Sequence, residues 1–486
     1  MFKLKLRNYR GFLDVEFNFS RVNILIGENS AGKSSILKFL LALKQSLLST
    51  NSREYNLTLS DELADLGNYY ETIYNHEIEK KLGFTFEFQR DYFDFFLKDA
   101  AYISYKNNLD ETLKKALTEK RQEISNYLGG EITTPTIIEF ELTNDLANHK
   151  NIITKISNTS VGELSIIQPQ IEQEIYVKGE KPLCSIIFKT EKETYTFSEI
   201  EYGKIAFMSI IDSESLKNKI KKEFENGKAE KLFWQIGFLL ITQNYIQNLL
   251  VDIKYMNPLL YEQAQRVYLK RDEKINFNIK DIKEVVYLLS GDNFLKGKAL
   301  ESFLKKYTEV LAKFGIIDSI NLNKTDFTRE LRIIVNGMDN NIKDVGFGVS
   351  LQMPIFAQAM ISENSRKEKN NQEIRSGETL LIEQPEVHLH PRLQAKFIDA
   401  LLGIGDNNIY IIETHSEHIV RKLQVLVKEG KYNLSPESVS INYLRKEGKD
   451  MISSSHSIDK KTGQLVPAFP DGFFDVSYNL AFQLLD

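Results

Sequence analysis

The sequence Gly27-Glu28-Asn29-Ser30-Ala31-Gly32-Lys33-Ser34 follows an apolar run, Val22 to Ile26, and precedes an amphipathic stretch, Ser35 to Leu48. This is the strand, glycine-rich loop and helix order of a phosphate-binding loop. Backbone N–H groups of such a loop surround phosphate oxygens, and the positive end of the helix dipole faces their charge. We favour this interpretation over an ordinary turn at a helix start, and we predict that the chain binds ATP or GTP.

The side chains of this loop have distinct predicted roles. Lys33 would reach the β- and γ-phosphates of ATP, and the Ser34 hydroxyl would ligate Mg²⁺. The residues predicted to bind the nucleotide in this segment are Asn29, Ser30, Ala31, Gly32, Lys33, Ser34 and Ser35.

The composition is that of a globular protein with 486 residues, 42% of them hydrophobic and 27% charged. A net charge of −5 excludes a uniformly basic nucleic-acid coat but leaves room for a local basic face. The single cysteine, Cys184, excludes an internal disulfide framework and fits a reducing cytoplasm. The apolar stretch Phe233 to Val251 carries several amide side chains, so we expect no membrane span.

Two further apolar runs, Thr379 to Glu383 and Asn408 to Glu413, end in polar residues. They are typical of buried parallel strands that deliver side chains to a site at their carboxyl ends. Many more residues separate them from the phosphate loop than a minimal nucleotide-binding core requires. We therefore predict an α/β fold with a large α+β insertion. The predicted parts are residues 1–95 (first part of the core), 96–325 (insertion) and 326–486 (second part of the core with a short tail).

The insertion has two predicted regions. Short β-branched runs from Thr136 to Phe197 predict a β-rich lobe, and the pattern from Ile205 to about Phe314 is mainly helical. The charge run Lys217 to Lys231 is more typical of a solvated helix face than of a DNA contact.

The acidic strand supplies the second half of the predicted site. It ends in Glu383-Gln384-Pro385-Glu386, and a carboxylate beside a phosphate loop can hold Mg²⁺ directly or through water. We assign that role to Glu383. His388 and His390 beside the glutamates could instead form a zinc site. We disfavour zinc because the two histidines would point in different directions and no third ligand is evident.

Two other segments predict contacts with the γ-phosphate. The glycines Gly346 and Gly348 permit close backbone approach, and Ser350 is a good N-cap for the helix that follows. Such a helix start can also bind a γ-phosphate presented by another subunit, although a plain cap is the alternative. His415 follows the strand Ile409 to Ile412, where it could sense the γ-phosphate or the attacking water.

Together these segments resemble the ABC-type ATPases of the RecF/SMC/OLD group of AAA-family proteins. They match a Walker A loop at 27–34, a degenerate signature at 346–352, a Walker B strand at 380–386 and a switch histidine, His415. The resemblance implies a P-loop NTPase of ABC-ATPase type, with a mixed sheet and helices. It also implies that a basic residue near the first strands, here Arg10, approaches the nucleotide. It covers residues 1–50 and roughly 327–486, whereas the insertion matches only loosely.

The resemblance also implies partners. In such proteins the signature of one protomer completes the ATP site of the other, which implies a head-to-head homodimer. Members of the group recur in phage-defence operons, commonly beside a nuclease, and the ATPase subunit of the PARIS system has a similar architecture. The implied function is an ATP-dependent sensor or clamp that controls a separate effector, with double-stranded DNA as a further partner. A RecF-like DNA-repair ATPase is the alternative, and the large insertion disfavours a transporter ATPase.

One departure affects catalysis. In most ABC ATPases the Walker B strand ends Asp-Glu-Pro, and the glutamate polarises the attacking water. Here Glu383 and Gln384 occupy those positions, and glutamine cannot accept a proton as a carboxylate can. Either Glu386 acts as the base, or hydrolysis is slow and ATP locks a scaffold, with Gln384 only orienting the water. The predicted catalytic residues are therefore Glu386, Gln384 and His415. Residues 416–486 are too few for the nuclease domain that follows the core in many OLD-type relatives.

Overall fold

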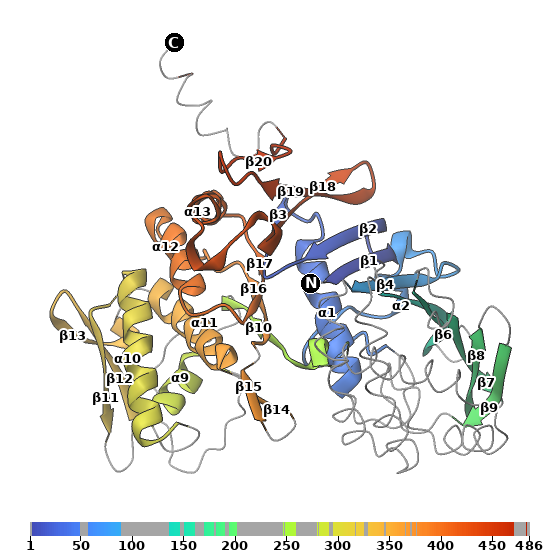
Figure 1. Cartoon of the computed structure of the whole chain (residues 1–486), viewed down its shortest axis with the longest axis horizontal. Helices are drawn as coiled ribbons and strands as arrows, with labels where there is room; N and C mark the ends of the chain where they lie inside the picture. Colours follow the sequence, from blue (N-terminus) through green and yellow to red (C-terminus); the bar gives the residue numbers. More distant parts are fainter. Residues whose placement is uncertain are drawn as a thin grey trace.

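Two large β-sheets and the helices between and around them make up the computed structural model (Figure 1). The structure describes residues 2–48, 57–88, 136–145, 150–160, 170–178, 181–189, 194–201, 246, 248–258, 279, 281–290, 295–315, 317–324, 329–344, 347–364, 366–369, 372–375, 377–470 and 483. The predicted charge run 217–231 lies outside these residues.

The predicted phosphate-binding loop, residues 27–34, begins at the end of β3. This strand belongs to a seven-stranded sheet of order β10-β16-β17-β3-β18-β19-β20. The first five strands of this order run parallel, and the last two pair antiparallel. This mixed sheet agrees with the predicted α/β architecture. Its strands are β3 (Val22–Gly27), β10 (Ile253–Met256), β16 (Thr379–Glu383), β17 (Ile409–Glu413), β18 (Val439–Glu447), β19 (Asp450–Ile458) and β20 (Leu465–Val466).

Both faces of the parallel strands are buried, which explains their continuous apolar runs. Alternate residues belong to two different cores: Leu25, Leu381 and Ile411 pack into one, whereas their neighbours Ile382 and Ile412 pack into the other. The apolar residues of these strands therefore pack into two cores at once, and β16 and β17 end in the carboxylates Glu383 and Glu413.

Helices cover both faces of this sheet, with α1 on one face and the later helices on the other (Figure 1). Capping residues define both ends of helix α13. Its N-cap Ser416 accepts a hydrogen bond from the Ile419 N–H at 3.2 Å, and Gly430 ends it in the left-handed region at φ 64°. The helices are α1 (Lys33–Leu48), α2 (Tyr69–Thr72), α9 (Ile282–Leu289), α10 (Gly297–Phe314), α11 (Phe347–Glu363), α12 (Pro391–Leu402) and α13 (Glu417–Glu429).

The second sheet has eight antiparallel strands in the order β2-β1-β4-β5-β6-β7-β8-β9. Helix α1 lies between the two sheets, where Phe39 contacts Phe84 with ring centroids 5.3 Å apart. Strands β5 to β9 fall in the predicted β-rich lobe. The strands are β1 (Phe2–Tyr9), β2 (Phe12–Phe19), β4 (Leu82–Phe88), β5 (Thr136–Asp145), β6 (Lys150–Ser160), β7 (Gln170–Lys178), β8 (Lys181–Lys189) and β9 (Thr194–Glu201).

The predicted three-part division stays a prediction, but two elements of the segment 96–325 join the core. Strand β10 pairs in parallel with β16 at the edge of the seven-stranded sheet. Helix α10 packs through Phe314 on Phe356 of α11, with ring centroids 5.2 Å apart. The polar stretch 362–378 contains a two-stranded antiparallel hairpin. The remaining strands are β11 (Ser319–Lys324), β12 (Arg329–Val335), β13 (Met338–Asn341), β14 (Arg366–Lys369) and β15 (Gln372–Arg375).

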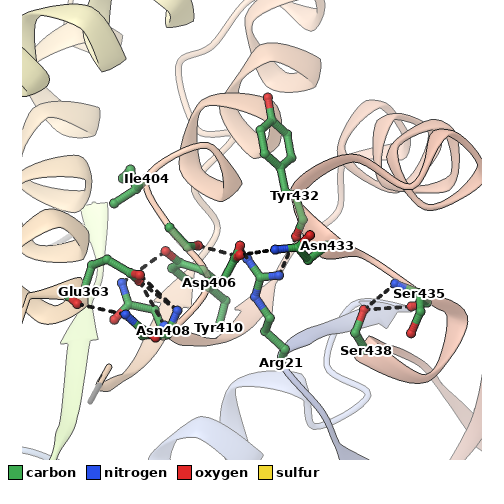
Figure 2. Close-up of polar contacts among 12 residues, drawn as sticks. Arg21, Glu363, Ile404, Asp406, Asn408, Tyr410, Tyr432, Asn433, Ser435 and Ser438 are labelled. Atoms are coloured by element: carbon green, nitrogen blue, oxygen red, sulfur yellow. Dashed lines mark hydrogen bonds and ion pairs between the residues drawn. The ribbon is translucent and has the colours of Figure 1, made fainter. Parts of the chain in front are cut away.

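A polar network fastens the amino ends of β3 and β17, opposite the phosphate loop (Figure 2). The Arg21 guanidinium donates to the Tyr432 carbonyl at 2.6 Å and to Asp406 Oδ1 at 2.8 Å. The Glu363 carboxylate accepts from the backbone N–H groups of Asn407 at 3.0 Å and Asn408 at 3.1 Å. Helix α11, the loop before β17, the start of β3 and the turn after α13 are thereby held together.

We predict that Arg21→Met lowers the free energy of unfolding by about 2 kcal/mol, because a largely buried guanidinium loses its hydrogen bonds to carbonyl and carboxylate oxygens. Urea unfolding followed by circular dichroism would measure this. Arg445→Met is the matched control, since the Arg445 guanidinium forms an exposed ion pair with Glu447, and it should change stability by less than about 0.5 kcal/mol. Equal losses in the two variants would contradict the structural role of the network.

Candidate nucleotide-binding site

The strands β16, β17 and β3 end side by side at one edge of the sheet. The register pairs Glu383 with Glu413, and Glu413 with Leu25, two residues before Gly27. Two carboxylates and the phosphate loop therefore lie in a row, as expected from apolar runs that end in polar residues. Glu383 was predicted from the sequence as a site residue, whereas Glu413 was not.

The loop has a backbone shape that only glycine permits at two positions. Gly27 has φ +145°, and a Cβ there would lie 1.9 Å from the Leu444 carbonyl oxygen; Gly32 has φ +89° and a Cβ would lie 2.6 Å from the Phe12 ring. Ser30 is also left-handed, at φ 58°. Left-handed residues in such a turn make successive N–H groups converge, and the first N–H groups of α1 have no partner within the helix. A backbone of this shape can accommodate an anion.

Lys33 begins α1 and is buried, with 4% of its surface exposed. Its Nζ donates to the Gly27 carbonyl at 3.1 Å and to the Glu28 carbonyl at 2.6 Å. Burial lowers the pKa of the Lys33 ammonium, and the charges of Glu413 and Glu386 act in the opposite direction. A cation is thus held inside the loop, next to the anion site.

Glu413 is the carboxylate bound directly to the loop. Its Oε1 accepts a hydrogen bond from Ser34 Oγ at 2.7 Å. Its Oε2 is buried and has no hydrogen-bond partner among the residues that the structure describes. Burial, with the negative charges of Glu383 and Glu386 nearby, raises the pKa of Glu413 to about 7. The sequence signal for Glu413 was its place as the last residue of a buried strand, the same signal that identified Glu383.

Glu386 joins the turns that follow β16 and β17. Its Oε2 accepts from Thr414 Oγ1 at 2.8 Å, and its Oε1 accepts from the His415 N–H at 2.5 Å. Burial raises the pKa of Glu386. Desolvation lowers the pKa of His415, and the positive charge of Lys33 acts in the same direction. The structure therefore brings the predicted catalytic residues Glu386 and His415 together near Lys33.

Glu383 has other partners. Its Oε2 accepts hydrogen bonds from the Tyr255 hydroxyl and from Asn257 Nδ2, the latter at 3.0 Å. Both donors come from the end of β10. Gln384 follows with φ 45°, and its N–H donates to the Glu413 carbonyl at 2.8 Å. The oxygen donors at this edge that could hold a metal are Ser34, Glu383 and Glu413.

Arg10 lies near the start of α1, where its Nη1 donates to Ser35 Oγ at 3.3 Å. The structure thus brings these two residues of the predicted set into contact. Asn29 and Ser30 are exposed at the tip of the loop, and Ala31 is buried beneath it.

The prediction that Ser350 caps a helix is wrong. Helix α11 begins at Phe347, so Ser350 lies inside the helix, where it is buried with 5% of its surface exposed. Gly348, in the first turn of α11, packs against the turn after β16: a Cβ there would lie 2.6 Å from the His388 carbonyl oxygen. Gly346 lies outside the described residues.

The zinc alternative gains no support from the geometry. His390 caps α12, since its Nδ1 accepts from the Arg392 N–H at 3.3 Å. Among the described residues, no group of three or more histidine, cysteine, aspartate or glutamate side chains is placed to hold a metal ion. A search of the same residues finds no helix with the length and apolar character of a membrane span.

The family model described as AAA ATPase domain matches residues 1–420. The chain belongs to the AAA ATPase domain family. Together with the mixed sheet and its glycine-rich loop, the match confirms the predicted P-loop NTPase fold. The matched range includes every residue of the predicted site.

This AAA ATPase is also similar to solved SMC head structures. The SmcHead bound to the C-winged helix domain of ScpA has 11% identity and a TM-score of 0.43, covering 94% of this chain and 98% of that one. The Pyrococcus furiosus Smc head with an extended coiled coil, bound to the C-terminal domain of ScpA, has 10% identity, a TM-score of 0.39 and full coverage of both chains. The Thermotoga maritima SMC head domain has 8% identity and a TM-score of 0.32, covering 93% of this chain and 97% of that one. No curated protein sequence matches this AAA ATPase.

We predict that Glu413 makes a contribution to stability that is lost as the pH rises from 4.5 to 7 when nucleotide and metal are absent. Folded Glu413 keeps its proton up to about pH 7, whereas in the unfolded chain it loses it near its ordinary value of 4.5. Between these values the folded state binds more protons, so a rising pH favours unfolding, by up to about 3 kcal/mol. Urea unfolding at pH 5 and pH 8 with a chelator would measure the effect.

Glu413→Gln should remove this component, so that the variant gains stability relative to the unmutated protein at pH 8 but not at pH 5. Glu429→Gln, an exposed substitution on α13, serves as the control. A Glu413→Gln difference that is the same at both pH values would contradict the burial of an uncompensated carboxylate at this position.

Proposed function

We propose that this chain binds and hydrolyses ATP with Mg²⁺ at the carboxyl edge of β3, β17 and β16. The observation that carries the proposal is the hydrogen bond between Ser34 of the phosphate loop and Glu413, with Lys33 buried beside them. The loop supplies an anion site, the ammonium supplies charge, and the carboxylate supplies oxygen ligands. These are the three components that a magnesium–nucleotide complex requires.

The residues fit the metal as well as the nucleotide. Mg²⁺ is bound in such sites through one or two carboxylates, a hydroxyl and the phosphates, and it would neutralise the charge on the β- and γ-phosphates. The Ser34 hydroxyl already contacts a carboxylate whose second oxygen, Glu413 Oε2, is buried without a partner. Lys33 would exchange its bonds to the Gly27 and Glu28 carbonyls for bonds to phosphate oxygens.

The same geometry supports slow hydrolysis. Both oxygens of Glu386 accept hydrogen bonds from the turn at Thr414 and His415. These bonds fix the Glu386 carboxylate beside the His415 backbone, whereas Gln384 can orient a water but cannot take its proton. We propose that Glu386 supplies the missing carboxylate and that turnover is low. An ATP-locked scaffold is the second candidate, and Gln384 at the usual glutamate position favours it.

We further propose that ATP joins two protomers and that the dimer controls a partner. Gly348 packs on the His388 backbone, and Gln352 Nε2 donates to the Pro385 carbonyl at 2.8 Å, so the start of α11 is tied to the turn after β16. A signature segment tied to the site in this way can report the nucleotide state to a second protomer. The resemblance to defence ATPases supports a separate effector, such as a nuclease, in antiviral defence, with double-stranded DNA as a further partner.

We predict that Lys33→Ala reduces ATP binding and ATP hydrolysis to background, because the loop loses its cation. Steady-state phosphate release, with and without double-stranded DNA, and ATP titration calorimetry would measure this. Sedimentation should show an ATP-dependent increase in mass for the unmutated chain and none for the variant.

Lys428→Ala, a lysine at the last turn of α13 and away from the site, is the matched control and should retain all three properties. A Lys33→Ala protein that unfolds at the same temperature as the unmutated chain yet still hydrolyses ATP would overturn the proposed site.

A separate prediction concerns the order of two catalytic variants. Glu386→Ala should lower turnover more than Gln384→Ala, because it removes a carboxylate and also releases the His415 backbone. Initial rates at saturating ATP would show this, with binding affinity measured alongside. The reverse order would return the catalytic role to residue 384.

A further inference from the structure

Two glutamates end neighbouring strands in register, but their surroundings differ. Glu383 ends β16 and Glu413 ends β17, and the backbone of Gln384 donates to the Glu413 carbonyl at 2.8 Å, which holds the two strand ends together. Only one of the two carboxylates contacts the phosphate loop. Their positions in the sequence would have suggested the opposite assignment, since Glu383 lies in the acidic motif.

The surroundings of the Glu413 carboxylate suit a bound cation. Oε1 accepts from the Ser34 hydroxyl at 2.7 Å, and Oε2 is buried with no hydrogen-bond partner among the described residues. An unsatisfied buried carboxylate oxygen is costly, unless a ligand satisfies it. The ligand that suits a carboxylate and a hydroxyl beside phosphates is a hard divalent cation.

One oxygen of the Glu383 carboxylate, Oε2, is bound by donors that come from β10 and the residue after it. This oxygen accepts from the Tyr255 hydroxyl and from Asn257 Nδ2, and Asn257 Nδ2 also contacts the Tyr255 hydroxyl at 3.0 Å. Both donors belong to the end of β10, the edge strand that pairs with β16. A cation at Glu383 Oε2 would have to displace two hydrogen-bond donors.

We propose that Glu413, and not Glu383, is the carboxylate that holds the divalent cation together with Ser34. Tyr255 and Asn257 are positioning residues that keep Glu383 on the β10 side. This assignment rests on the proposed function, because it presumes that the phosphate loop binds a metal–nucleotide complex. It transfers to Glu413 the metal role that the sequence predicts for Glu383.

The experiment separates metal binding from nucleotide binding in the full chain. AMP-PNP affinity is measured by calorimetry with a chelator, and Mn²⁺ affinity is then measured by electron paramagnetic resonance at saturating AMP-PNP. Glu413→Gln should weaken Mn²⁺ binding by about tenfold or more, since loss of even an outer-shell partner has effects of this size. Its metal-free AMP-PNP affinity should stay within about threefold. Glu383→Gln should change Mn²⁺ affinity by less than about threefold.

Glu413→Asp keeps the charge and should recover part of the Mn²⁺ affinity, which a merely structural role would not produce. A larger loss of Mn²⁺ binding in Glu383→Gln than in Glu413→Gln would overturn the assignment while leaving the nucleotide site intact. Failure of the unmutated chain to bind AMP-PNP, with or without metal, would overturn the proposed function and the assignment with it. Melting temperatures of all variants confirm that each is folded.

Discussion

The hydrogen bond from Ser34 to Glu413 joins the phosphate-binding loop to the neighbouring strand, and the rest of the site is arranged around it. It forms only if β3 and β17 are adjacent, parallel and in the observed register. That register in turn places Glu383 on the next strand and Glu386 within reach of the His415 backbone. A slip of one residue would turn each carboxylate to the opposite face of the sheet.

Several buried ionisable side chains lie close together in the site. Three glutamates share one edge with Lys33, and burial raises the pKa of two of them, Glu386 and Glu413. Desolvated charges of one sign destabilise a folded protein unless a ligand compensates them. The opposite edge of the same strands bears the structural role, since Arg21 and Glu363 fix the strand starts there (Figure 2). The amino ends of the parallel strands are therefore stabilised by hydrogen bonds within the protein. At their carboxyl ends the buried charges would be stabilised by a ligand.

Much of the core could be predicted from the sequence because its signals are local. The loop at 27–34 is a motif, and the runs ending at Glu383 and Glu413 are apolar because both sheet faces are buried. Glu413 was missed because its partner, Ser34, lies far away in the chain, and only the strand order brings them together. Strand β10 was missed because four residues, Ile253–Met256, give too short a pattern. Ser350 was misjudged because a serine that could cap a helix can equally lie inside one, and α11 begins at Phe347, before Ser350.

The most direct measurement is an experimental structure of the full chain with AMP-PNP and Mg²⁺. We expect the triphosphate in the loop at 27–34, with Lys33 Nζ moved from the Gly27 and Glu28 carbonyls to the phosphates. The metal should lie between Ser34 and Glu413. Nucleotide bound elsewhere on the chain, or a loop in which Lys33 keeps its carbonyl contacts beside bound nucleotide, would contradict a magnesium–ATP site at this edge of the sheet.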